Sequence, residues 1–297
     1  MKNPYFGRVL TAMVTPFAAD GSVNLEAAKQ LVEGWIAHGT DALVVTGSTG
    51  EAATMTIEEK KALWATVLKQ VNGRIPVIAG TGSNNTANSV ETTKIADEIG
   101  VDGFLIVGPY YNKPTQEGYY QHFKAISECT QKPIILYNVP GRTAANIPPA
   151  TVARIAKDFK NVVAIKEAAG NVAQVAELFR ILPGDFTIYS GDDGLLLPFA
   201  SVGATGVVSV LANIGGEILQ DLMNAYESGD VKKAAEINKK MVPLANAMFI
   251  ETNPIPVKAA VTLVTGIDAG APRLPLTPMT EGAKEKMKAI LAEGGLL

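Results

Sequence analysis

The chain has 297 residues, of which 47% are apolar, 19% charged and 6% aromatic, so it can bury one large core or two ordinary ones. The 28 glycines and 17 prolines follow no short period, which excludes a low-complexity or disordered protein. A net charge of −3 with scattered basic residues argues against nucleic acid as a partner.

Few residues could hold a metal or form a disulfide. The single cysteine, Cys129, and the only histidines, His38 and His122, have no metal-ligand spacing, so no metal site is expected. One cysteine cannot make an internal disulfide, and the start of the chain lacks a long apolar segment, so we expect a cytoplasmic protein. The longest uncharged stretch, residues 194–216, contains Pro198 and several glycines. We interpret it as a buried helix and a buried strand rather than a membrane span.

A repeated unit organises the first two thirds of the chain. Apolar, β-rich runs end in polar residues or glycine, and each precedes a segment with helical periodicity. The runs begin near Val9, Ala42, Pro76, Gly103, Pro133, Val162, Phe186 and Gly206. Their uninterrupted apolar character is typical of a parallel sheet buried on both faces. Eight such units predict a (β/α)8 TIM barrel. The alternative, a doubly wound sheet, lacks G-x-G-x-x-G after any run.

Helical signals flank these runs. Apolar residues recur at helical spacing after Asn24, and Thr56-x-x-Glu59 is a capping box that opens a helix at 60–71. After the last run the chain has helical patterns only, at 217–226, 231–250, 256–264 and 281–291. We therefore place the barrel in residues 1–214 and a C-terminal helical extension in residues 215–297.

In such a barrel the active site lies where the strands end. The five polar segments that follow strands are Thr46–Glu51, Gly108–Asn112, Tyr137–Arg142, Lys166–Glu167 and Ser190–Asp193. Hydroxyls, phenols, one arginine and one lysine are thus expected on one rim.

Lys166 is the sharpest candidate, because it ends the apolar strand at 162–165. Desolvation there favours the neutral amine, which is the form that attacks a carbonyl to make a Schiff base. The alternative is a structural ion pair with Glu167. Tyr137, at the end of the preceding strand, could shuttle a proton beside Lys166 or simply fill the rim.

Other rim residues suit the binding of anions. Ser48 and Thr49 lie between glycines and offer hydroxyls and backbone N–H groups to a small carboxylate, although a plain turn fits equally well. Arg142 could hold a carboxylate or make a surface ion pair. The pair Tyr110–Tyr111 is typical of packing or an interface, and Asp192–Asp193 of a helix N-cap rather than a metal site.

Together these motifs resemble the dihydrodipicolinate synthases, within the wider family of pyruvate-dependent Schiff-base lyases and aldolases. The resemblance covers nearly the whole chain. Its motifs are Thr-Ala-Met-Val-Thr-Pro-Phe at 11–17, Gly-Ser-Thr-Gly-Glu at 47–51, Ala-Gly-Thr-Gly at 79–82, Pro-Tyr-Tyr-Asn-Lys-Pro at 109–114, Tyr-Asn-Val-Pro-Gly-Arg-Thr at 137–143, Ile-Lys-Glu-Ala at 165–168, Ser-Gly-Asp-Asp at 190–193, Gly-Val-Val-Ser-Val at 206–210 and Asn-Pro-Ile-Pro-Val-Lys at 253–258.

The resemblance implies a reaction without a cofactor. Lys166 would form an imine with pyruvate, and the resulting enamine would attack the aldehyde of L-aspartate semialdehyde in lysine and diaminopimelate biosynthesis. Tyr137, Ser48 and Tyr111 of a neighbouring subunit would relay protons. The implied assembly is a homotetramer built as a dimer of dimers.

The resemblance also implies the substrate-binding residues. Thr49 would hold the pyruvate carboxylate, and Arg142 that of the second substrate. Val208, through its carbonyl, and Gly191 would help to shape the site.

Two departures from the family pattern bear on specificity and regulation. Ser48 stands where the synthases more often have threonine, and Gly-Ser-Thr-Gly-Glu also resembles the related N-acetylneuraminate lyases, but Arg142 favours the synthases. Lysine-sensitive synthases carry two histidines and a glutamate where this chain has Ile57, Lys60 and Asn88, although Tyr110 and Asn84 of that pocket are retained. We therefore expect weak or no inhibition by lysine. A barrel that lost turnover and a phosphate-handling isomerase remain as alternatives.

Overall fold

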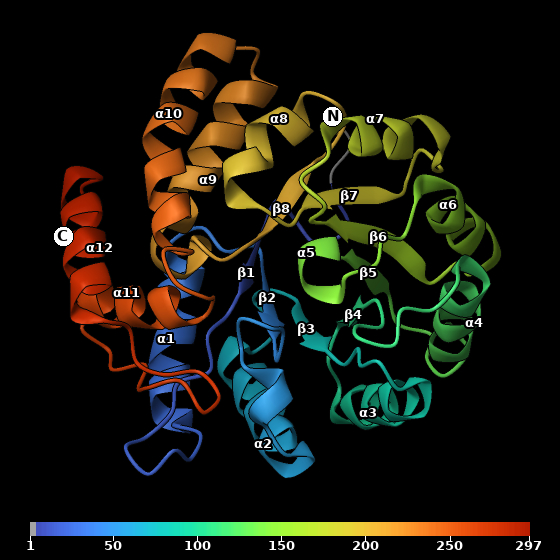
Figure 1. The fold of residues 1–297 in the computed structure, drawn as a ribbon, viewed down its shortest axis with the longest axis horizontal. Coiled ribbons are helices and arrows are strands. Elements are labelled where there is room, and N and C mark those ends of the chain that lie inside the picture. The colour runs from blue at the N-terminus through green and yellow to red at the C-terminus, as the bar shows by residue number, and fades with distance from the viewer. Residues whose placement is uncertain (1–3) are drawn as a thin grey trace.

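The computed structural model describes residues 4–297, so residues 1–3 of the predicted barrel domain lie outside the described part. Eight parallel strands pair in sequence order, and β8 pairs with β1 to close a barrel (Figure 1). They are β1 (Val9–Ala12), β2 (Ala42–Val45), β3 (Val77–Gly80), β4 (Gly103–Val107), β5 (Ile134–Asn138), β6 (Val162–Glu167), β7 (Thr187–Ser190) and β8 (Gly206–Ser209). The predicted barrel is confirmed, and every strand begins at the predicted residue or one residue later.

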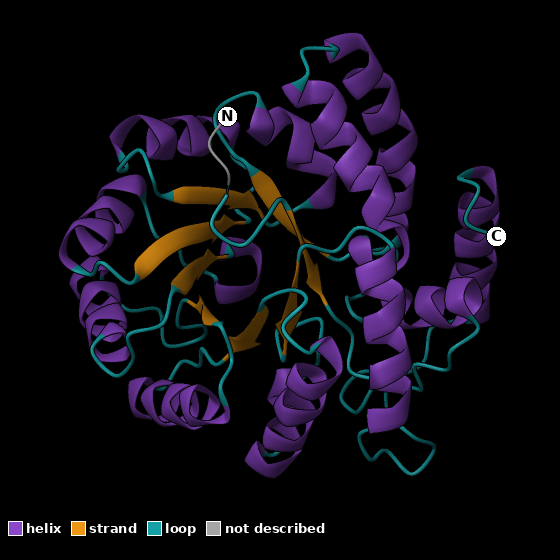
Figure 2. Ribbon diagram, turned by 180° about the vertical axis from the view of Figure 1, so that it is seen from behind, coloured by secondary structure: helices purple, strands orange, loops and turns teal. Residues whose placement is uncertain are grey.

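Helices surround the strands on all sides (Figure 2). The helices that follow strands are α1 (Leu25–Ala37), α2 (Ile57–Val71), α3 (Thr86–Ile99), α4 (Gln116–Ser127), α6 (Pro149–Asp158), α7 (Val172–Ile181), α8 (Leu196–Ala200) and α9 (Ala212–Glu227). Shorter turns lie in the loops after β2, β5 and β7: η1 (Ala52–Thr54), α5 (Pro140–Thr143) and η2 (Asp193–Leu195).

The barrel strands are apolar throughout because each has two buried faces. In β2, Ala42 and Val44 belong to the cluster inside the barrel, whereas Leu43 and Val45 pack in the larger cluster beneath the helices. All four side chains are fully buried. Since successive residues of a strand point to opposite faces, a parallel barrel needs the uninterrupted apolar runs seen in the sequence.

Side chains near the helix starts satisfy backbone N–H groups. The side chain of Asn24 accepts from the Ala27 N–H at the start of α1. At α2, Thr56 and Glu59 form the predicted capping box, which opens the helix at Ile57 rather than at Lys60. These caps fix where the chain turns from the strand ends into the helices.

The C-terminal region consists of helices, as predicted. After α9 come α10 (Val231–Ala247), α11 (Ile255–Thr265) and α12 (Glu281–Glu293), seen at the left of Figure 1. Helix α9 begins before the predicted start at Glu217 and is kinked at Gly215, where φ is −156° and ψ is 46°. The division of the chain at residue 214 falls within this helix and stays a prediction.

The long uncharged stretch at 194–216 contains α8 and β8. Most of its apolar side chains are buried, as the interpretation as a buried helix and strand requires. Within residues 4–297, the structure has no helix with the length and apolar character needed to cross a membrane.

Candidate active site

Lys166 and Tyr137 lie side by side at the ends of neighbouring strands. They are paired in the register of β6 with β5, and the Lys166 Nζ lies 4.4 Å from the centroid of the Tyr137 ring. Lys166 is 5% exposed and Tyr137 is 7% exposed. Among residues 4–297 no carboxylate forms an ion pair with Lys166. The alternative of a structural pair with Glu167 is therefore wrong.

Glu167 follows Lys166 and so points to the opposite face of β6. Its carboxylate accepts hydrogen bonds from the Asn138 Nδ2 at 3.0 Å, the Gln174 Nε2 at 3.0 Å and the Ala169 N–H at 2.7 Å. Burial raises the pKa of this carboxyl, while the hydrogen bonds act against that rise. Glu167 thus fastens β6 to β5 and α7, outside the site.

Gly191 leaves room for the Lys166 side chain. A Cβ at this position would lie 3.1 Å from the Lys166 Cε and 2.6 Å from the Ala168 Cβ. The Gly191 N–H also donates to the Glu167 carbonyl at 2.7 Å, which brings the backbone of the β7 loop against β6. Any larger residue here would displace the lysine stem.

The loop after β2 carries Ser48 and Thr49 in different environments. Ser48 is exposed and lines a cavity, whereas Thr49 is only 4% exposed. The Thr49 Oγ1 accepts from the Asn253 Nδ2 at 3.0 Å, so its own proton is free for another acceptor. The loop therefore forms the predicted turn and also carries the two predicted hydroxyl groups, those of Ser48 and Thr49.

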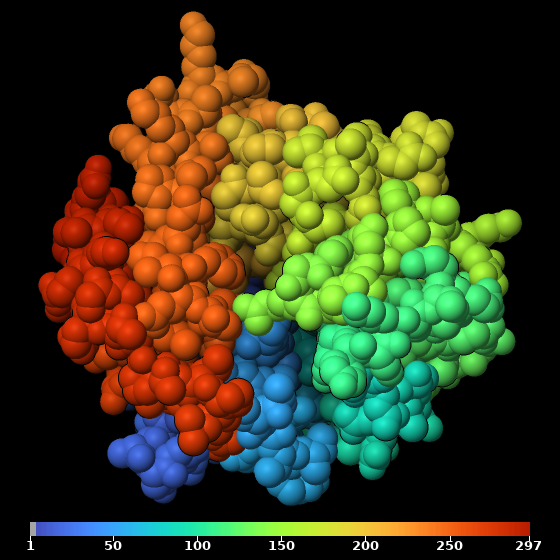
Figure 3. All heavy atoms as spheres, viewed as in Figure 1, coloured from blue at the N-terminus to red at the C-terminus, as the bar shows by residue number. Residues whose placement is uncertain are grey.

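A cavity of about 570 Å³ opens at the carboxyl ends of the strands. Ser48, Tyr137 and Arg142 line it, and it extends between α2 and α3 to Lys60 and Asn88. In Figure 3 the same face is built from blue, green and orange segments that are far apart in the sequence. The structure therefore brings together three of the predicted site residues around one opening.

Arg142 lies on the short helix α5 and is exposed. Its Nη2 donates to the Asn253 carbonyl at 3.3 Å, and no carboxylate pairs with it within residues 4–297. The alternative of a surface ion pair is wrong. The guanidinium keeps free donors at the edge of the cavity, as the binding of an anion requires.

Five of the eight predicted site residues do not line this cavity, and they are Lys166, Thr49, Gly191, Tyr111 and Val208. Tyr111 is 89% exposed, with a φ of +72°, while its neighbour Tyr110 lines the cavity. Val208 is fully buried in the cluster inside the barrel. Neither side chain reaches the cavity of its own chain.

The two aspartates after Gly191 have separate tasks. The Asp192 side chain caps η2 by accepting from the Gly194 N–H at 2.9 Å, as predicted. Asp193 is 2% exposed and instead accepts from the N–H groups of Val210 and Leu211, which fixes the loop after β8. Residues 4–297 contain no group of three His, Cys, Asp or Glu side chains that could hold a metal ion.

Sequence reasoning missed the contribution of the C-terminal extension. Asn253 binds both Thr49 and Arg142, and Lys258 binds Glu51 in the loop after β2. A signal for Lys258 exists, because it is the only charge in the apolar segment 254–267 and a buried charge needs a partner. The signal does not say which partner.

The arrangement favours chemistry between an amine and a carbonyl compound. A buried amine lies beside a phenol and has no carboxylate partner in the described part of the chain, and hydroxyl and guanidinium donors line the nearby cavity. An amine in this position can attack a carbonyl, the phenol and hydroxyl can move protons, and the remaining donors can hold anions.

Known proteins share both the sequence and the fold. The pattern of the dihydrodipicolinate synthetase family matches residues 5–294. A 4-hydroxy-tetrahydrodipicolinate synthase of Desulforamulus reducens is 52% identical over 291 residues, covering 98% of each chain.

Solved structures agree with this match. A dihydrodipicolinate synthase of Bacillus anthracis superposes with a TM-score of 0.95 at 46% identity, over 97% of this chain and 98% of the other. A lysine-bound synthase of Cyanidioschyzon merolae gives 0.97 at 42% identity, over 99% and 100%. The chain belongs to the dihydrodipicolinate synthetase family.

Proposed function

We propose that this chain is a lyase that condenses pyruvate with L-aspartate 4-semialdehyde, through a Schiff base on Lys166, to give 4-hydroxy-tetrahydrodipicolinate. The reaction is the first committed step of lysine and diaminopimelate biosynthesis. Family membership supports the reaction. The observation that carries the mechanism is the buried Lys166 amine, which has no carboxylate partner among the described residues 4–297 and lies 4.4 Å from the Tyr137 ring centroid.

The reaction proceeds through an imine and an enamine. The neutral Lys166 amine attacks the C2 carbonyl of pyruvate, and loss of water leaves the protonated imine. This group withdraws electrons, so a proton leaves the C3 methyl and an enamine forms. Its carbon attacks the aldehyde of the second substrate, and the aldehyde oxygen takes up a proton. The amino group of that substrate then attacks the imine carbon, closes the ring and releases Lys166.

Tyr137 and Ser48 relay the protons in these steps. Both line the cavity, and Tyr137 is paired with Lys166 in the register of β5 with β6. Ser48 supplies the hydroxyl but lacks the methyl group that restricts the rotamer of a threonine. We expect a more mobile hydroxyl here than in relatives that carry threonine.

The carboxylate groups of the two substrates bind to separate donors. The free proton of the Thr49 hydroxyl and nearby backbone N–H groups hold the pyruvate carboxylate. Arg142, at the edge of the cavity, holds the carboxylate of the semialdehyde. Gly191 and the Val208 carbonyl shape the space around the lysine.

The working form is a homo-oligomer in the cytoplasm, most simply a tetramer built as a dimer of dimers. Tyr111 is 89% exposed, so it can reach the site of a neighbouring subunit and complete the proton relay there. Val172 and Phe179 on α7 are 37% and 62% exposed and offer a second apolar contact. Light scattering after size exclusion would give the subunit number.

Lysine inhibits this enzyme weakly or not at all. The cavity extends to Ile57, Lys60 and Asn88, and no ion pair neutralises Lys60 within residues 4–297. Its ammonium would repel the positive groups of a bound lysine.

Borohydride reduction in the presence of pyruvate tests the proposal. Intact mass and peptide mapping should find one reduced pyruvate adduct, on Lys166, and none in the Lys166→Ala variant. A second assay compares L-aspartate semialdehyde with N-acetylmannosamine as the acceptor, and only the first should be consumed. Absence of the adduct, or its presence on another lysine, would refute the mechanism.

A further inference from the structure

We propose that the buried ion pair between Glu51 and Lys258 is a positioning device for the turn that carries Ser48 and Thr49, so that the C-terminal extension takes part in catalysis. The inference rests on the proposed function, because it assigns Ser48 and Thr49 to proton relay and carboxylate binding. Neither Glu51 nor Lys258 lines the cavity, so both act through the turn.

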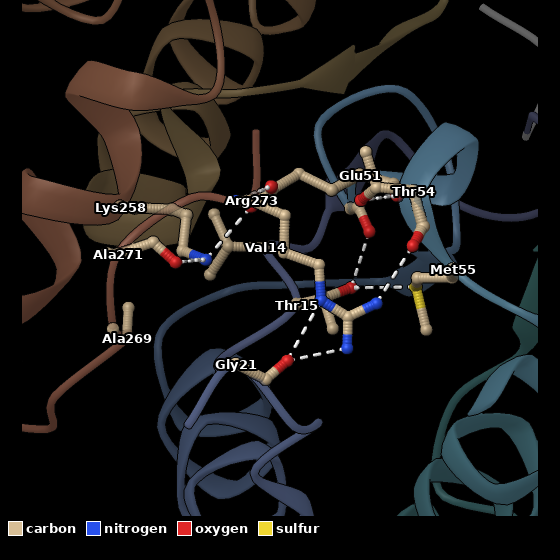
Figure 4. A network of polar contacts seen from close by, with 12 residues as sticks. Val14, Thr15, Gly21, Glu51, Thr54, Met55, Lys258, Ala269, Ala271 and Arg273 are labelled. Carbon is tan, nitrogen blue, oxygen red and sulfur yellow. Dashed lines mark hydrogen bonds and ion pairs between the residues drawn. The ribbon is translucent and has the colours of Figure 1, made fainter. Parts of the chain in front are cut away.

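The pair joins two distant parts of the chain in a fully buried position. The Lys258 Nζ on α11 lies 2.9 Å from the Glu51 Oε1, and the two side chains are 1% and 2% exposed. Lys258 also donates to the Ala271 carbonyl at 3.2 Å and lies 4.1 Å from the Phe17 ring centroid. Its partners therefore come from three segments that are separate in the sequence, as Figure 4 shows in part.

The backbone of Glu51 closes the turn that presents the two hydroxyls. Its N–H donates to the Ser48 carbonyl at 3.2 Å, and its own carbonyl accepts from the Thr54 N–H at 3.0 Å. Its φ is +54°, in the left-handed region that a glutamate adopts only when its surroundings hold it there. The side-chain anchor on Lys258 supplies such a restraint within three residues of Ser48.

The second carboxylate oxygen of Glu51 is also held by the C-terminal extension. The Arg273 N–H donates to the Glu51 Oε2 at 2.9 Å. The Arg273 guanidinium donates to the Thr54 carbonyl at 2.8 Å (Figure 4). It also pairs with Glu59 of α2. One segment of the extension thus fixes both the Glu51 side chain and the end of the same loop.

The neighbouring hydroxyl has a parallel anchor. Asn253 donates to the Thr49 Oγ1, and the Thr15 hydroxyl donates to the Gly50 carbonyl at 2.6 Å. Residues 49, 50 and 51 are therefore each held by a different side chain. A loop fixed at three successive residues keeps its hydroxyls in one geometry, which is what catalysis through positioned groups requires.

A buried ion pair is a poor way to gain stability, because desolvation of two charges offsets their attraction. Well-packed apolar residues of similar size would fill the same space at no such cost. A direct charge-assisted tether, however, fixes the distance between α11 and the turn more tightly than apolar packing does. Apolar replacements should therefore restore stability in either case, but they should restore activity only if the pair has a purely structural role.

The experiment compares four variants of the full-length protein. Glu51→Gln and Lys258→Met each leave one charge buried without its partner, whereas the double variant leaves neither. Met287→Ala in α12 is the control, because it removes a fully buried apolar side chain from the same extension without changing either charge of the pair. Urea unfolding, kcat, the KM for pyruvate and borohydride trapping at saturating pyruvate are measured for each.

We expect both single variants to lose stability and the double variant to regain it. The kcat/KM of the double variant should nevertheless stay about 10- to 100-fold below that of the unmodified enzyme, because the turn is no longer tethered. Misplaced Thr49 raises the KM for pyruvate, and misplaced Ser48 lowers kcat. Met287→Ala should lose stability with both constants unchanged.

Recovery of both stability and kcat/KM in the double variant would overturn the proposal. If the double variant stays unstable, its rate is compared with that of Met287→Ala, and an equal rate would also overturn it. Trapping of Lys166 should persist in every variant. Failure of trapping in the unmodified enzyme would instead refute the proposed mechanism, so the two failures are distinguishable.

Discussion

Two lysines are buried in different regions of this molecule, and only one of them has a carboxylate partner. Lys166 ends β6 at the mouth of the barrel, where it faces the Tyr137 ring and makes no ion pair within residues 4–297. Lys258 lies in α11 of the C-terminal extension, 2.9 Å from the Glu51 carboxylate. An unpaired buried amine adds nothing to folding and is available for chemistry, whereas a paired one holds two segments together.

Replacing each lysine with methionine should separate these roles, with the largest effect at Lys166. Lys166→Met should lower kcat/KM by at least about 1,000-fold while leaving the free energy of unfolding unchanged or higher. Lys258→Met should lower the free energy of unfolding by about 3–5 kcal/mol, because the Glu51 carboxylate is left buried and unpaired. Enzyme assays and urea unfolding measure the two effects. Equal stability losses in both variants would remove the distinction.

Arg142 extends the comparison to an exposed charge that has no carboxylate partner within residues 4–297. Arg142→Ala should lower kcat/KM for L-aspartate semialdehyde by about 10- to 100-fold and leave the KM for pyruvate nearly unchanged. Arg154→Ala is the matched control, because Arg154 is exposed and already paired with Glu117. Steady-state kinetics with each substrate varied in turn would check this. A rise in the KM for pyruvate alone would reassign Arg142 to the first substrate.

Lys60 is a third lysine, partly buried and without an ion pair within residues 4–297. Burial lowers its pKa. We expect no inhibition by lysine at submillimolar concentration. Replacing Ile57 and Lys60 with histidine, and Asn88 with glutamate, should lower the inhibition constant by about 10-fold or more, because a positive group is removed and a carboxylate partner is added. Submillimolar inhibition of the unmodified enzyme would contradict this account.

His122 gives the smallest expected effect and lies outside the site, on α4. It is 3% exposed, and burial lowers its pKa from 6.5 to about 4. Because the unfolded chain binds the proton first as pH falls, stability should drop between about pH 6.5 and about pH 4, by roughly 1–3 kcal/mol. The variant His122→Gln should flatten this part of the curve of urea midpoint against pH. An unchanged slope would assign the acid sensitivity to other groups.

Much of the fold could be predicted because its signals are local. Each strand of a parallel barrel is buried on both faces, so it forms an uninterrupted apolar run such as residues 42–45. Parallel strands also have their carboxyl ends on one rim, so Lys166 and Tyr137 could be placed together without coordinates. The misplaced start of α9 reflects a kink at Gly215 that periodicity does not reveal.

The anchors of the site could not be predicted in the same way. Side chains alternate along β6, so Glu167 points away from Lys166. The two residues are adjacent in the sequence, and their opposite orientation is evident only once the strand is known. Tyr111 lies on a loop and Arg142 on the four-residue helix α5, and neither segment is long enough for a periodic pattern to fix the direction of a side chain.

By itself the sequence determined the barrel, its helical extension and the rim on which the reactive lysine, phenol and hydroxyl gather, since each follows from periodicity or from strand direction. Only the tertiary structure decided the partners, which are Glu51 for Lys258 and Asn253 for Thr49. For Lys166 it provides no carboxylate partner within residues 4–297. The two pairs are separated by 207 and 204 residues. Hydrogen bonds and ion pairs act over a few ångströms, so they depend on where the folded chain returns rather than on the local pattern.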